Sequence, residues 1–306
     1  THLFPEPFIV EIVKRKHPKI KHLCVVDGNC FYYSYYKNKN LKDFIVPIFS
    51  RADSFIFLNK EIISDLVQEF PGCSDYIINK ESFIPPGVDT DLFKKISSLE
   101  DKKRVFENLK YKIKNDNGDT FFLEDFSFQE TLKIMTYGDF SLEKGIPLLV
   151  IIFPFIRELF PEVKLYISGR GENKGKCEKL IHYLSEGKRN EFFSLLGELV
   201  EEFGEKYGGD NVYELCYYNI IDPVFAEKYF SAGSGIEKYI DFTGYLNHGK
   251  LPDLLSLMDL CVFPVVSREG FSISVIEAMA CGVPVIIPES TGMSDIENTL
   301  KEIYEK

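Results

Sequence analysis

The chain has 306 residues, 45% of them hydrophobic and 27% charged, a balance that supports folded cores and excludes an intrinsically disordered protein. The length favours two domains over one. The formal net charge of −11 argues against nucleic acid as a partner, because phosphate backbones are bound by basic surfaces, although backbone amides and a few placed cations could still bind a small anionic ligand.

Cysteine and histidine spacing argues against metal and disulfide sites. The seven cysteines are odd in number and show no CxxC spacing, and the five histidines show no ligand spacing. We therefore expect neither a zinc site nor a disulfide framework, and a reducing, cytoplasmic location. The most apolar run, residues 146–156, is too short to span a bilayer.

Two runs near the start of the chain each allow two interpretations. The basic run KRKHPKIKH, residues 14–22, could contact anionic lipid head groups on the inner face of a membrane. We favour the alternative, a solvated helix end before a buried strand. The aromatic-rich run CFYYSYYKNKN, residues 30–40, could line a ligand groove, but such runs more often form core and rim.

Short apolar runs recur along the chain, and each is predicted to be a buried strand. Most are nearly continuous in apolar residues, as expected for a parallel sheet covered on both faces. They comprise residues 22–26, 54–58, 133–138, 163–169, 240–244, 260–265 and 284–288. Helical patterns follow these strands, which predicts a doubly wound, Rossmann-like α/β architecture.

Domain boundaries are predicted from proline, glycine and charge. Pro85, Pro86 and Gly87 interrupt regular structure, and the polar segment 94–131, which contains the turn signal NDNGD, is predicted to be a linker or insertion. This gives an N-terminal domain over residues 1–93 and a fuller domain over residues 132–306. Helical periodicity with little strand signal predicts a helical insertion at residues 172–236.

The stretch REGFSISVIEAMACGVPVI, residues 268–286, predicts a turn, a helix and a strand. The turn follows a predicted strand, the helix covers residues 272–281, and Gly282 suits the position after its C-terminus. The free amides at the start of this helix attract an anion. Ligands of open α/β sheets bind beyond the carboxyl ends of the strands, which is where this turn lies.

Two glutamates, Glu269 and Glu277, flank the start of this helix. An ionised carboxylate only accepts hydrogen bonds, so sugar hydroxyls are natural partners. The helix rises roughly 7–8 Å between Ser272 and Glu277. That spacing suits two hydroxyl-bearing rings joined by a diphosphate, as in a nucleotide sugar. Outside this sequence context, a pair of glutamates at this spacing would more often belong to a solvated helix face.

Together these motifs resemble retaining family 4 glycosyltransferases of the GT-B fold. EGFSISVIEAMACGVPVI resembles their E-x7-E signature, YGDFSLEKGIPLL (residues 137–149) their donor loop, and LYISGRG (residues 165–171) the next strand and glycine turn. DFTGYLNHGKLPDLLSLMDLCVFPVVSREGF (residues 241–271) resembles the run before the signature. ADSFIFLNKEI and FIPPGVDTDLF resemble the end of the N-terminal domain. The resemblance covers most of residues 50–297.

The resemblance implies a GT-B fold of two Rossmann-like, doubly wound parallel-sheet domains, the N-terminal one incomplete. It implies retaining transfer of a sugar from a nucleotide-diphosphate donor to a glycan, lipid-linked or small-molecule acceptor, with no metal and no bound cofactor. Glu269 would orient the donor sugar and Lys144 would neutralise the departing diphosphate, while Glu277 would accept hydrogen bonds from the ribose. The remaining donor-side residues are Gly138, Asp139, Gly169, Arg170, Gly244, Gly270, Phe271 and Ser272, and the acceptor-side residues are Asp27 and Gly28.

The chain departs from the family pattern at several positions. Asp139 stands where the family usually has Arg or Lys, and Arg170 or Lys174 from the neighbouring turn could compensate for the lost cation. Asp27 stands where many relatives have His, and Ser272 replaces a usual glycine. His248 lies near where the family holds the base.

The ends are short compared with the family, and a piece of a longer enzyme is favoured over a reduced paralogue. The alternative function is a catalytically inactive sugar-nucleotide-binding or partner protein of this fold. A phosphorylase or epimerase of the same fold is a third option.

Overall fold

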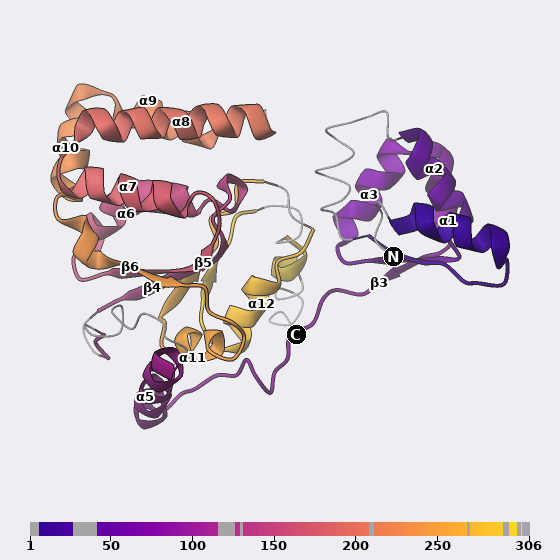
Figure 1. The fold of residues 1–306 in the computed structure, drawn as a ribbon, viewed down its shortest axis with the longest axis horizontal. Helices are drawn as coiled ribbons and strands as arrows, with labels where there is room; N and C mark the ends of the chain where they lie inside the picture. Colours follow the sequence, from indigo (N-terminus) through magenta and orange to yellow (C-terminus); the bar gives the residue numbers. More distant parts are fainter. Residues whose placement is uncertain are drawn as a thin grey trace. The chain divides into compact units, whose positions relative to one another are not determined.

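The computed structural model describes residues 6–26, 42–115, 126–128, 131–207, 211–267, 270–289, 294–298 and 301. By their contacts, the residues form two compact α/β units (Figure 1). The N-terminal unit consists of Thr1–Gly87, Ser267–Ile273 and Glu289–Lys306. The C-terminal unit consists of Val88–Val266 and Ser274–Pro288.

The N-terminal unit contains a three-stranded parallel sheet in the order β1-β2-β3. Its strands are β1 (Leu23–Val26), β2 (Ser54–Phe57) and β3 (Glu81–Phe83), and its helices are α1 (Glu6–Lys16), α2 (Lys42–Arg51), α3 (Lys60–Glu69), the short 3-10 helix η3 (Pro71–Cys73) and α4 (Ser74–Ile78). The first two strands were predicted. The sequence did not predict β3, because all three of its residues are exposed and it carries no apolar run.

Aromatic side chains from α2, β2 and the end of α3 form the core of this unit. The ring of Phe49 packs edge-on against the rings of Phe55 and Phe70, with ring centroids 5.7 and 5.4 Å apart, an arrangement that aromatic pairs prefer. The side chain of Asn59 caps the start of α3 and accepts hydrogen bonds from the backbone N–H groups of Glu61 and Ile62. These are two of the four backbone donors that have no partner within the helix at its start.

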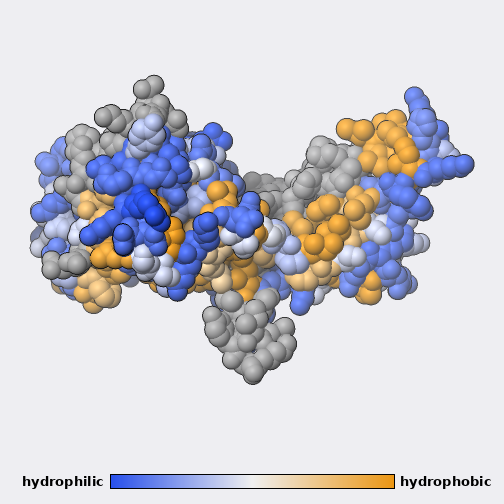
Figure 2. Space-filling model, turned by 90° about the horizontal axis from the view of Figure 1, so that it is seen from below, coloured by the Kyte–Doolittle hydropathy of each residue, from blue (hydrophilic) through white to orange (hydrophobic). Residues whose placement is uncertain are grey.

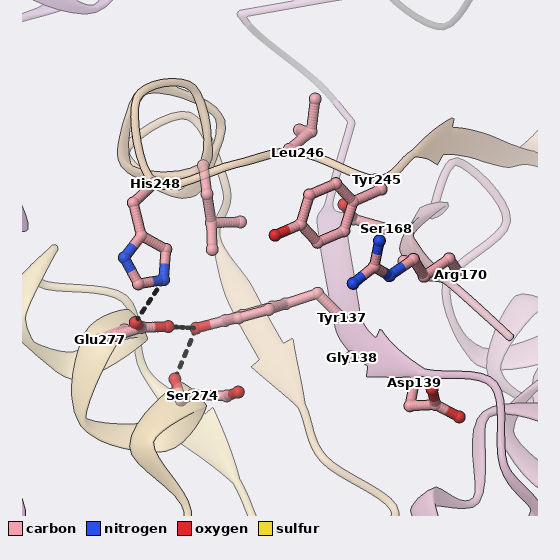
Figure 3. A pocket seen from close by; sticks show the side chains of 12 residues that line it. Tyr137, Gly138, Asp139, Ser168, Arg170, Tyr245, Leu246, His248, Ser274 and Glu277 are labelled. Atoms are coloured by element: carbon pink, nitrogen blue, oxygen red, sulfur yellow. Dashed lines mark hydrogen bonds and ion pairs between the residues drawn. The ribbon is translucent and has the colours of Figure 1, made fainter.

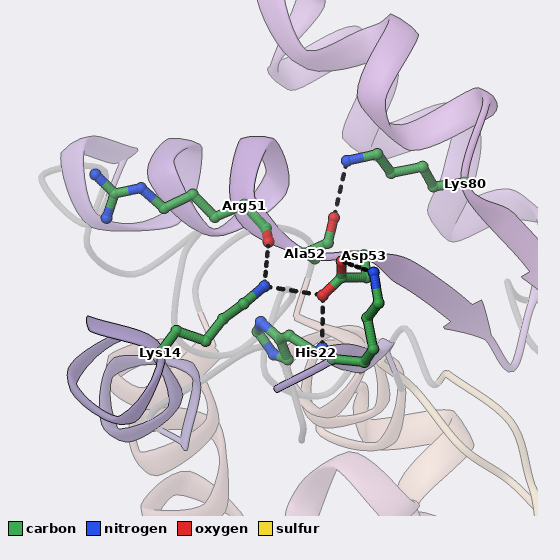
Figure 4. A network of polar contacts seen from close by, with 7 residues as sticks. Lys14, His22, Arg51, Ala52, Asp53 and Lys80 are labelled. Carbon is green, nitrogen blue, oxygen red and sulfur yellow. Dashed lines mark hydrogen bonds and ion pairs between the residues drawn. The ribbon is translucent and has the colours of Figure 1, made fainter. Parts of the chain in front are cut away.

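A carboxylate with three donors joins α1, β1 and β2 (Figure 4). Asp53 accepts hydrogen bonds from Lys14 Nζ at 2.8 Å, Lys21 Nζ at 3.2 Å and the backbone N–H of His22 at 2.7 Å. The Lys14 bond is the largest of the causes that lower the pKa of Asp53 well below its ordinary value. Lys14 and Lys21 belong to the basic run of residues 14–22, so two of its cations stabilise the fold.

The C-terminal unit contains a five-stranded, fully parallel sheet in the order β6-β5-β4-β7-β8. Its strands are β4 (Lys133–Asp139), β5 (Lys164–Arg170), β6 (Ile240–Gly244), β7 (Leu260–Val262) and β8 (Val285–Ile286). All five were predicted, because each is rich in apolar residues that a sheet covered on both faces buries. Residues 133–139 pair in register with residues 164–170.

Helices cover both faces of this sheet (Figure 1). On one side lie the short η5 (Leu142–Lys144), α6 (Ile146–Leu159) and α7 (Lys174–Ser185), and α8 (Arg189–Tyr207), α9 (Val212–Ile220), α10 (Pro223–Gly233) and η6 (Ile236–Tyr239) pack beyond or beside them. On the other side lie α11 (Leu251–Leu255) and α12 (Ile273–Ala280). In the predicted insertion at 172–236, the structure has α7 to α10 and the beginning of η6.

The polar segment 94–131 differs from the predicted linker. It contains the 17-residue helix α5 (Leu99–Asn115), which packs on α11 within the C-terminal unit. Phe106, Leu109 and Ile113 form a buried stripe on this lysine-rich helix, a spacing typical of an amphipathic helix. Lys112 Nζ donates to Asp253 Oδ2 at 2.7 Å and to the carbonyl of Gly249 at 2.9 Å.

The contacts also shift the unit boundaries relative to the prediction. The first unit ends at Gly87 instead of residue 93, and Glu289–Lys306 contacts the N-terminal unit although it lies at the end of the chain. Contacts between segments distant in sequence leave no composition signal, so the sequence did not predict this return.

The surface mixes hydrophilic and apolar areas (Figure 2). The largest apolar areas in that view lie on the N-terminal unit, at the right. The most apolar described helix, α6, is instead buried in the core of the C-terminal unit. Within the described residues, no helix combines the length and apolar character that crossing a bilayer requires.

Candidate functional site

The strand order of the C-terminal unit reverses beside β4. From β4 the chain proceeds outward to β5 and β6, and it then returns to place β7 and β8 on the other side of β4. In open parallel sheets, ligands bind beyond the carboxyl ends of the strands at such a reversal.

A pocket of about 260 Å³ lies at this position (Figure 3). Its walls come from the carboxyl ends of β4 and β5, the loop after β6 and the first turns of α12. The lining residues are Tyr137, Gly138, Asp139, Ser168, Gly169, Arg170, Tyr245, Leu246, His248, Leu251, Ser274 and Glu277.

Two glycines bring the ends of β4 and β5 close together beside the pocket. Gly138 and Gly169 pair in the parallel register and have φ values of 144° and 150°, a region that other residues rarely adopt. A Cβ atom on Gly169 would lie 1.9 Å from the carbonyl oxygen of Gly138. At the half-buried Gly138, by contrast, no atom lies within 4 Å of an added Cβ, so a ligand has room to approach the main chain there.

The carboxylate of Glu277 is the buried acid of the pocket. The residue is 5% exposed on α12, and burial raises its pKa, while His248 and Tyr137 act in the opposite direction. The hydroxyl of Tyr137 lies 2.6 Å from the carbonyl of Ser274 and 3.3 Å from Glu277 Oε2. Because a hydroxyl has one proton, the shorter contact is the main bond of Tyr137, and Glu277 keeps acceptor capacity for a ligand.

His248 contacts the second oxygen of the same carboxylate. Its Nε2 atom lies 3.3 Å from Glu277 Oε1, and its side chain is 66% exposed. The imidazole packs edge-on against the buried ring of Phe93, with ring centroids 5.4 Å apart. The histidine is thus held between an apolar ring and the acid.

The opposite side of the pocket carries a cation and an aromatic ring (Figure 3). The guanidinium of Arg170 lies 4.7 Å from the ring centroid of Tyr245, within the range of a cation–π contact. Tyr245 is 60% exposed. Asp139 lines the same side and pairs with Arg170 in the strand register.

The structure brings together Gly138, Asp139, Gly169, Arg170 and Glu277, which the sequence predicted for one site. Gly244 adjoins them, because it has a φ of 70° and its carbonyl accepts a 2.9 Å bond from the Ser168 hydroxyl before the chain enters Tyr245.

The remaining predicted residues lie elsewhere or outside the described part. Gly270, Phe271 and Ser272 precede α12 and contact the N-terminal unit, where the carbonyl of Gly270 accepts a 2.8 Å bond from Asn59 Nδ2. Glu269, Asp27 and Gly28 lie outside the described residues.

Lys144 lies in η5, partly buried, and is not among the residues that line the pocket. The next residue, Gly145, has a φ of 70°, and a Cβ atom there would lie 1.8 Å from the carbonyl oxygen of Pro264. The backbone N–H of Val266 donates to the carbonyl of Glu143 at 2.9 Å. These contacts fix the loop that carries Lys144 against the segment after β7.

Four polar pocket residues were not predicted, namely Tyr137, Ser168, Tyr245 and Ser274. Three of them are direct neighbours of the predicted glycines 138, 169 and 244, and Ser274 precedes Glu277 by one helical turn. Position next to a strand-end glycine was therefore a usable signal.

Metal ligation has no candidate in the described part of the chain. There, no group of three or more His, Cys, Asp or Glu side chains could hold a metal ion. The expectation that no metal is needed stays a prediction.

Residues 223–302 match a family model described as "Glycosyl transferases group 1". This segment runs from α10 through Glu277 and the end of the sheet, so it contains part of the pocket but not β4 or β5. The comparison with curated proteins gave no match.

Several solved structures resemble the whole chain. Anabaena HepE in complex with UDP-glucose superposes with a TM-score of 0.55 at 16% identity, covering 94% of this chain and 58% of that one. Sucrose-phosphate synthase from Thermosynechococcus elongatus gives 0.54 at 17%, covering 94% and 54%. The N-terminal domain of Candida albicans trehalose-6-phosphate phosphatase gives 0.57 at 13%, covering 96% and 57%.

The chain thus spans well under two thirds of each of these three proteins, at identities that establish the fold alone. The predicted fold class is confirmed: this is an α/β chain with the Rossmann-like parallel sheets of GT-B glycosyltransferases, and its residues 223–302 match the group 1 glycosyl transferase model.

Proposed function

We propose that the chain binds a nucleotide-diphosphate sugar in the pocket at the ends of β4 and β5 and transfers the sugar to an acceptor with retention of configuration. The observation that carries this proposal is the buried Glu277 carboxylate at the strand-order reversal, beside Gly138, where no atom lies within 4 Å of an added Cβ. A buried carboxylate with unused acceptor capacity suits the vicinal hydroxyls of a ribose.

The other pocket residues suit the rest of a nucleotide. The exposed ring of Tyr245, with Arg170 beside it, offers a flat surface on which a base could stack. The backbone at Gly138 and Gly169 leaves room for the diphosphate. Arg170 supplies a positive charge on the side where Asp139 replaces the usual cation of the family.

The names of the similar solved structures support sugar transfer to different degrees. The Anabaena protein was solved with UDP-glucose and the Thermosynechococcus protein is a sucrose-phosphate synthase, and both names fit transfer from a sugar nucleotide. The Candida domain has a comparable similarity under the name of a phosphatase. Fold alone therefore does not select the reaction, and the pocket chemistry must do so.

In this proposal the catalytic step depends on positioning and on stabilising the departing diphosphate. Glu269 would orient the donor sugar, Lys144 would neutralise the leaving group, and the amides of Gly270, Phe271 and Ser272 would lie near sugar and phosphate. Glycan, lipid-linked and small-molecule acceptors remain open, with Asp27 and Gly28 as the acceptor-side candidates.

The test is a donor-hydrolysis and transfer assay on the chain and on the variants Glu269→Ala and Lys144→Ala. We expect each variant to lose at least about 100-fold in rate, the scale of one transition-state charge contact, with an unchanged circular dichroism spectrum. Lys228→Ala is the control, because Lys228 is an exposed lysine of α10 that pairs with Glu158. Full activity in both test variants would reject the proposed roles.

A second candidate is a sugar-nucleotide-binding protein without activity, which Asp139 in the pocket favours, since it places an anion where the family has a cation. Calorimetric titration with UDP and GDP separates the two candidates. Tight binding without turnover supports the second, and binding with turnover supports the first.

Contact with a membrane and a cytoplasmic location both stay predictions. In the basic run, Lys14 and Lys21 bind Asp53, whereas Arg15, Lys16 and Lys19 are exposed. Co-sedimentation with anionic vesicles tests this contact, and we expect it to be weak, because only those three cations remain for lipid head groups.

A further inference from the structure

We propose that His248 is a positioning residue that keeps the buried Glu277 carboxylate in its acceptor form and thereby extends nucleotide binding into mildly acid solution. The inference rests on the proposed function, because it assigns a role at the same pocket. It adds a residue and a pH dependence that neither the motif spacing nor the family match provides.

The geometry places the imidazole where it acts on the acid. His248 comes from the loop after β6, whereas Glu277 comes from α12, and Nε2 and Oε1 lie 3.3 Å apart. The edge-on contact with the buried Phe93 ring fixes the plane of the imidazole. Figure 3 shows the ring nitrogen directed at the carboxylate. Although His248 is largely exposed, these contacts therefore keep its Nε2 atom directed at the Glu277 carboxylate.

The charges around Glu277 make this contact important. Burial is the largest influence on its pKa and disfavours the ionised form, and His248 is the main opposing influence. The other bond, from Tyr137, is shared with the carbonyl of Ser274 and is weaker. Without His248, the carboxylate would keep only this weak donor.

The remaining ionisable groups near the acid do not supply a positive charge at this contact. They are Tyr137 on β4, Cys261 on β7, Cys281 directly after α12 and Asp253 on α11, with Asp139 and Arg170 lining the same pocket. Tyr137, Cys261 and Cys281 are neutral at neutral pH, because burial raises the pKa of each. Among the described residues, the one ion-pair contact of Glu277 is the contact with His248.

The sign of the effect follows from these charges. A protonated carboxyl accepts hydrogen bonds poorly, so ribose binding weakens as Glu277 takes up a proton. The charge interaction with His248 at 3.3 Å opposes this proton uptake, so the ring matters most in acid solution, where the carboxylate begins to be protonated. Removing the ring should therefore harm nucleotide binding little at pH 8 and much more at pH 5.5.

The experiment measures UDP affinity by calorimetry between pH 5.5 and 8 for the wild type and for His248→Ala. We expect the dissociation constant of His248→Ala, divided by that of the wild type, to stay below about 3 at pH 8 and to rise several-fold by pH 5.5, because loss of the ring leaves a larger fraction of Glu277 protonated in acid. His248→Gln restores a donor without a positive charge, and it should recover affinity at pH 8 only.

A second measurement does not depend on function. The carboxyl carbon of Glu277, followed by NMR in glutamate-labelled protein without nucleotide, should titrate at higher pH in His248→Ala than in the wild type. The matched control is His182→Ala, because His182 Nδ1 lies 3.0 Å from the half-exposed Glu237 of the same unit. This control should leave the titration of Glu277 unchanged.

The outcomes separate the two proposals. If the wild type does not bind UDP or GDP, the proposed function fails, and the NMR titration still tests His248. If nucleotide binds but the affinity ratio stays constant with pH, or the titration of Glu277 does not move, the role of His248 is rejected. Tighter UDP binding by His248→Ala would also reject it, because His248 would then be a competitor of the ribose.

Discussion

Folding shifts the pKa values of two carboxylates, one in each unit, in opposite directions. Asp53 of the N-terminal unit accepts bonds from two lysines and a backbone N–H, which lower its pKa. Glu277 of the C-terminal unit is buried beside a tyrosine and an exposed histidine, and its pKa is raised, chiefly by that burial.

This difference separates an acid that stabilises structure from one that binds something. Ionised Asp53 is favoured by folding, whereas ionised Glu277 is disfavoured by it. Acids that a fold disfavours are concentrated at functional sites, where ligand binding compensates for the lost stability. Glu277 also lies beside strand ends that two glycines hold close together, whereas Asp53 lies in a network of charged side chains.

The largest expected effect concerns the backbone that shapes the pocket. Gly169→Ala places a Cβ atom 1.9 Å from the Gly138 carbonyl oxygen, so β4 and β5 must separate at their ends. We expect a loss of more than about 3 kcal/mol in the local opening free energy of these strands, measured by hydrogen exchange.

Gly138→Ala is the matched control. It has a similar φ, and no atom lies within 4 Å of the added Cβ, so it should cost only the conformational strain of about 1–2 kcal/mol. Equal losses in the two variants would show that close approach of the strands does not shape this edge.

The charge of Glu277 should matter for nucleotide binding. Glu277→Gln keeps the shape of the side chain but removes its charge, and we expect UDP to bind about 10–100-fold more weakly by calorimetry, the scale of one charged hydrogen bond. At pH 7 the same variant should resist unfolding better than the wild type, because it no longer buries an ionised acid.

The pH dependence of this stability has a definite sign. Because the pKa of Glu277 is raised in the folded chain, the ionised side chain lowers the free energy of unfolding above that pKa. This loss of stability disappears as the pH falls through the pKa. The stability difference between Glu277→Gln and the wild type should therefore shrink in acid. A difference that grew in acid would contradict the raised pKa.

Removing the charge of Asp53 should lower stability, in contrast to Glu277→Gln, and this is the smallest of the expected effects. Asp53→Asn should destabilise β1 and β2 by about 1 kcal/mol at pH 7, since the carboxylate is 33% exposed and solvent weakens its ion pairs. The lowered pKa of Asp53 means that its contribution is present above about pH 4, the unfolded value, and is lost at lower pH. Hydrogen exchange of β1 at pH 6 and pH 3 measures this, and equal protection of both proteins at pH 6 would exclude a structural role.

Much of the fold was predictable, because parallel strands covered on both faces carry apolar runs. The five strands of the C-terminal sheet and the first two of the N-terminal sheet follow from such runs. The strand β3 did not, since its pairing with β2 depends on backbone bonds made by exposed residues. The sequence did not predict the helix α5, because its many lysines made the segment look polar throughout. Phe106, Leu109 and Ile113 nevertheless have the spacing of an amphipathic helix.

The site was partly predictable for a related reason. Strand-end glycines and a glutamate within a helix are visible as sequence spacing, and Gly138, Gly169 and Glu277 do line one pocket. The contact of His248 with Glu277 joins residues 29 positions apart, with α11 and β7 between them, so no local pattern encodes it. Lys144 matches the family spacing, but its place in η5 depends on how Gly145 packs against Pro264.

We propose that Glu277 holds the ribose of a nucleotide sugar at the ends of β4 and β5. A crystal structure of the chain soaked with UDP would show the contacts of this carboxylate. We expect ribose hydroxyls within hydrogen-bond distance of the Glu277 carboxylate and the base beside Tyr245. A nucleotide bound elsewhere, with this pocket filled by protein side chains, would contradict it.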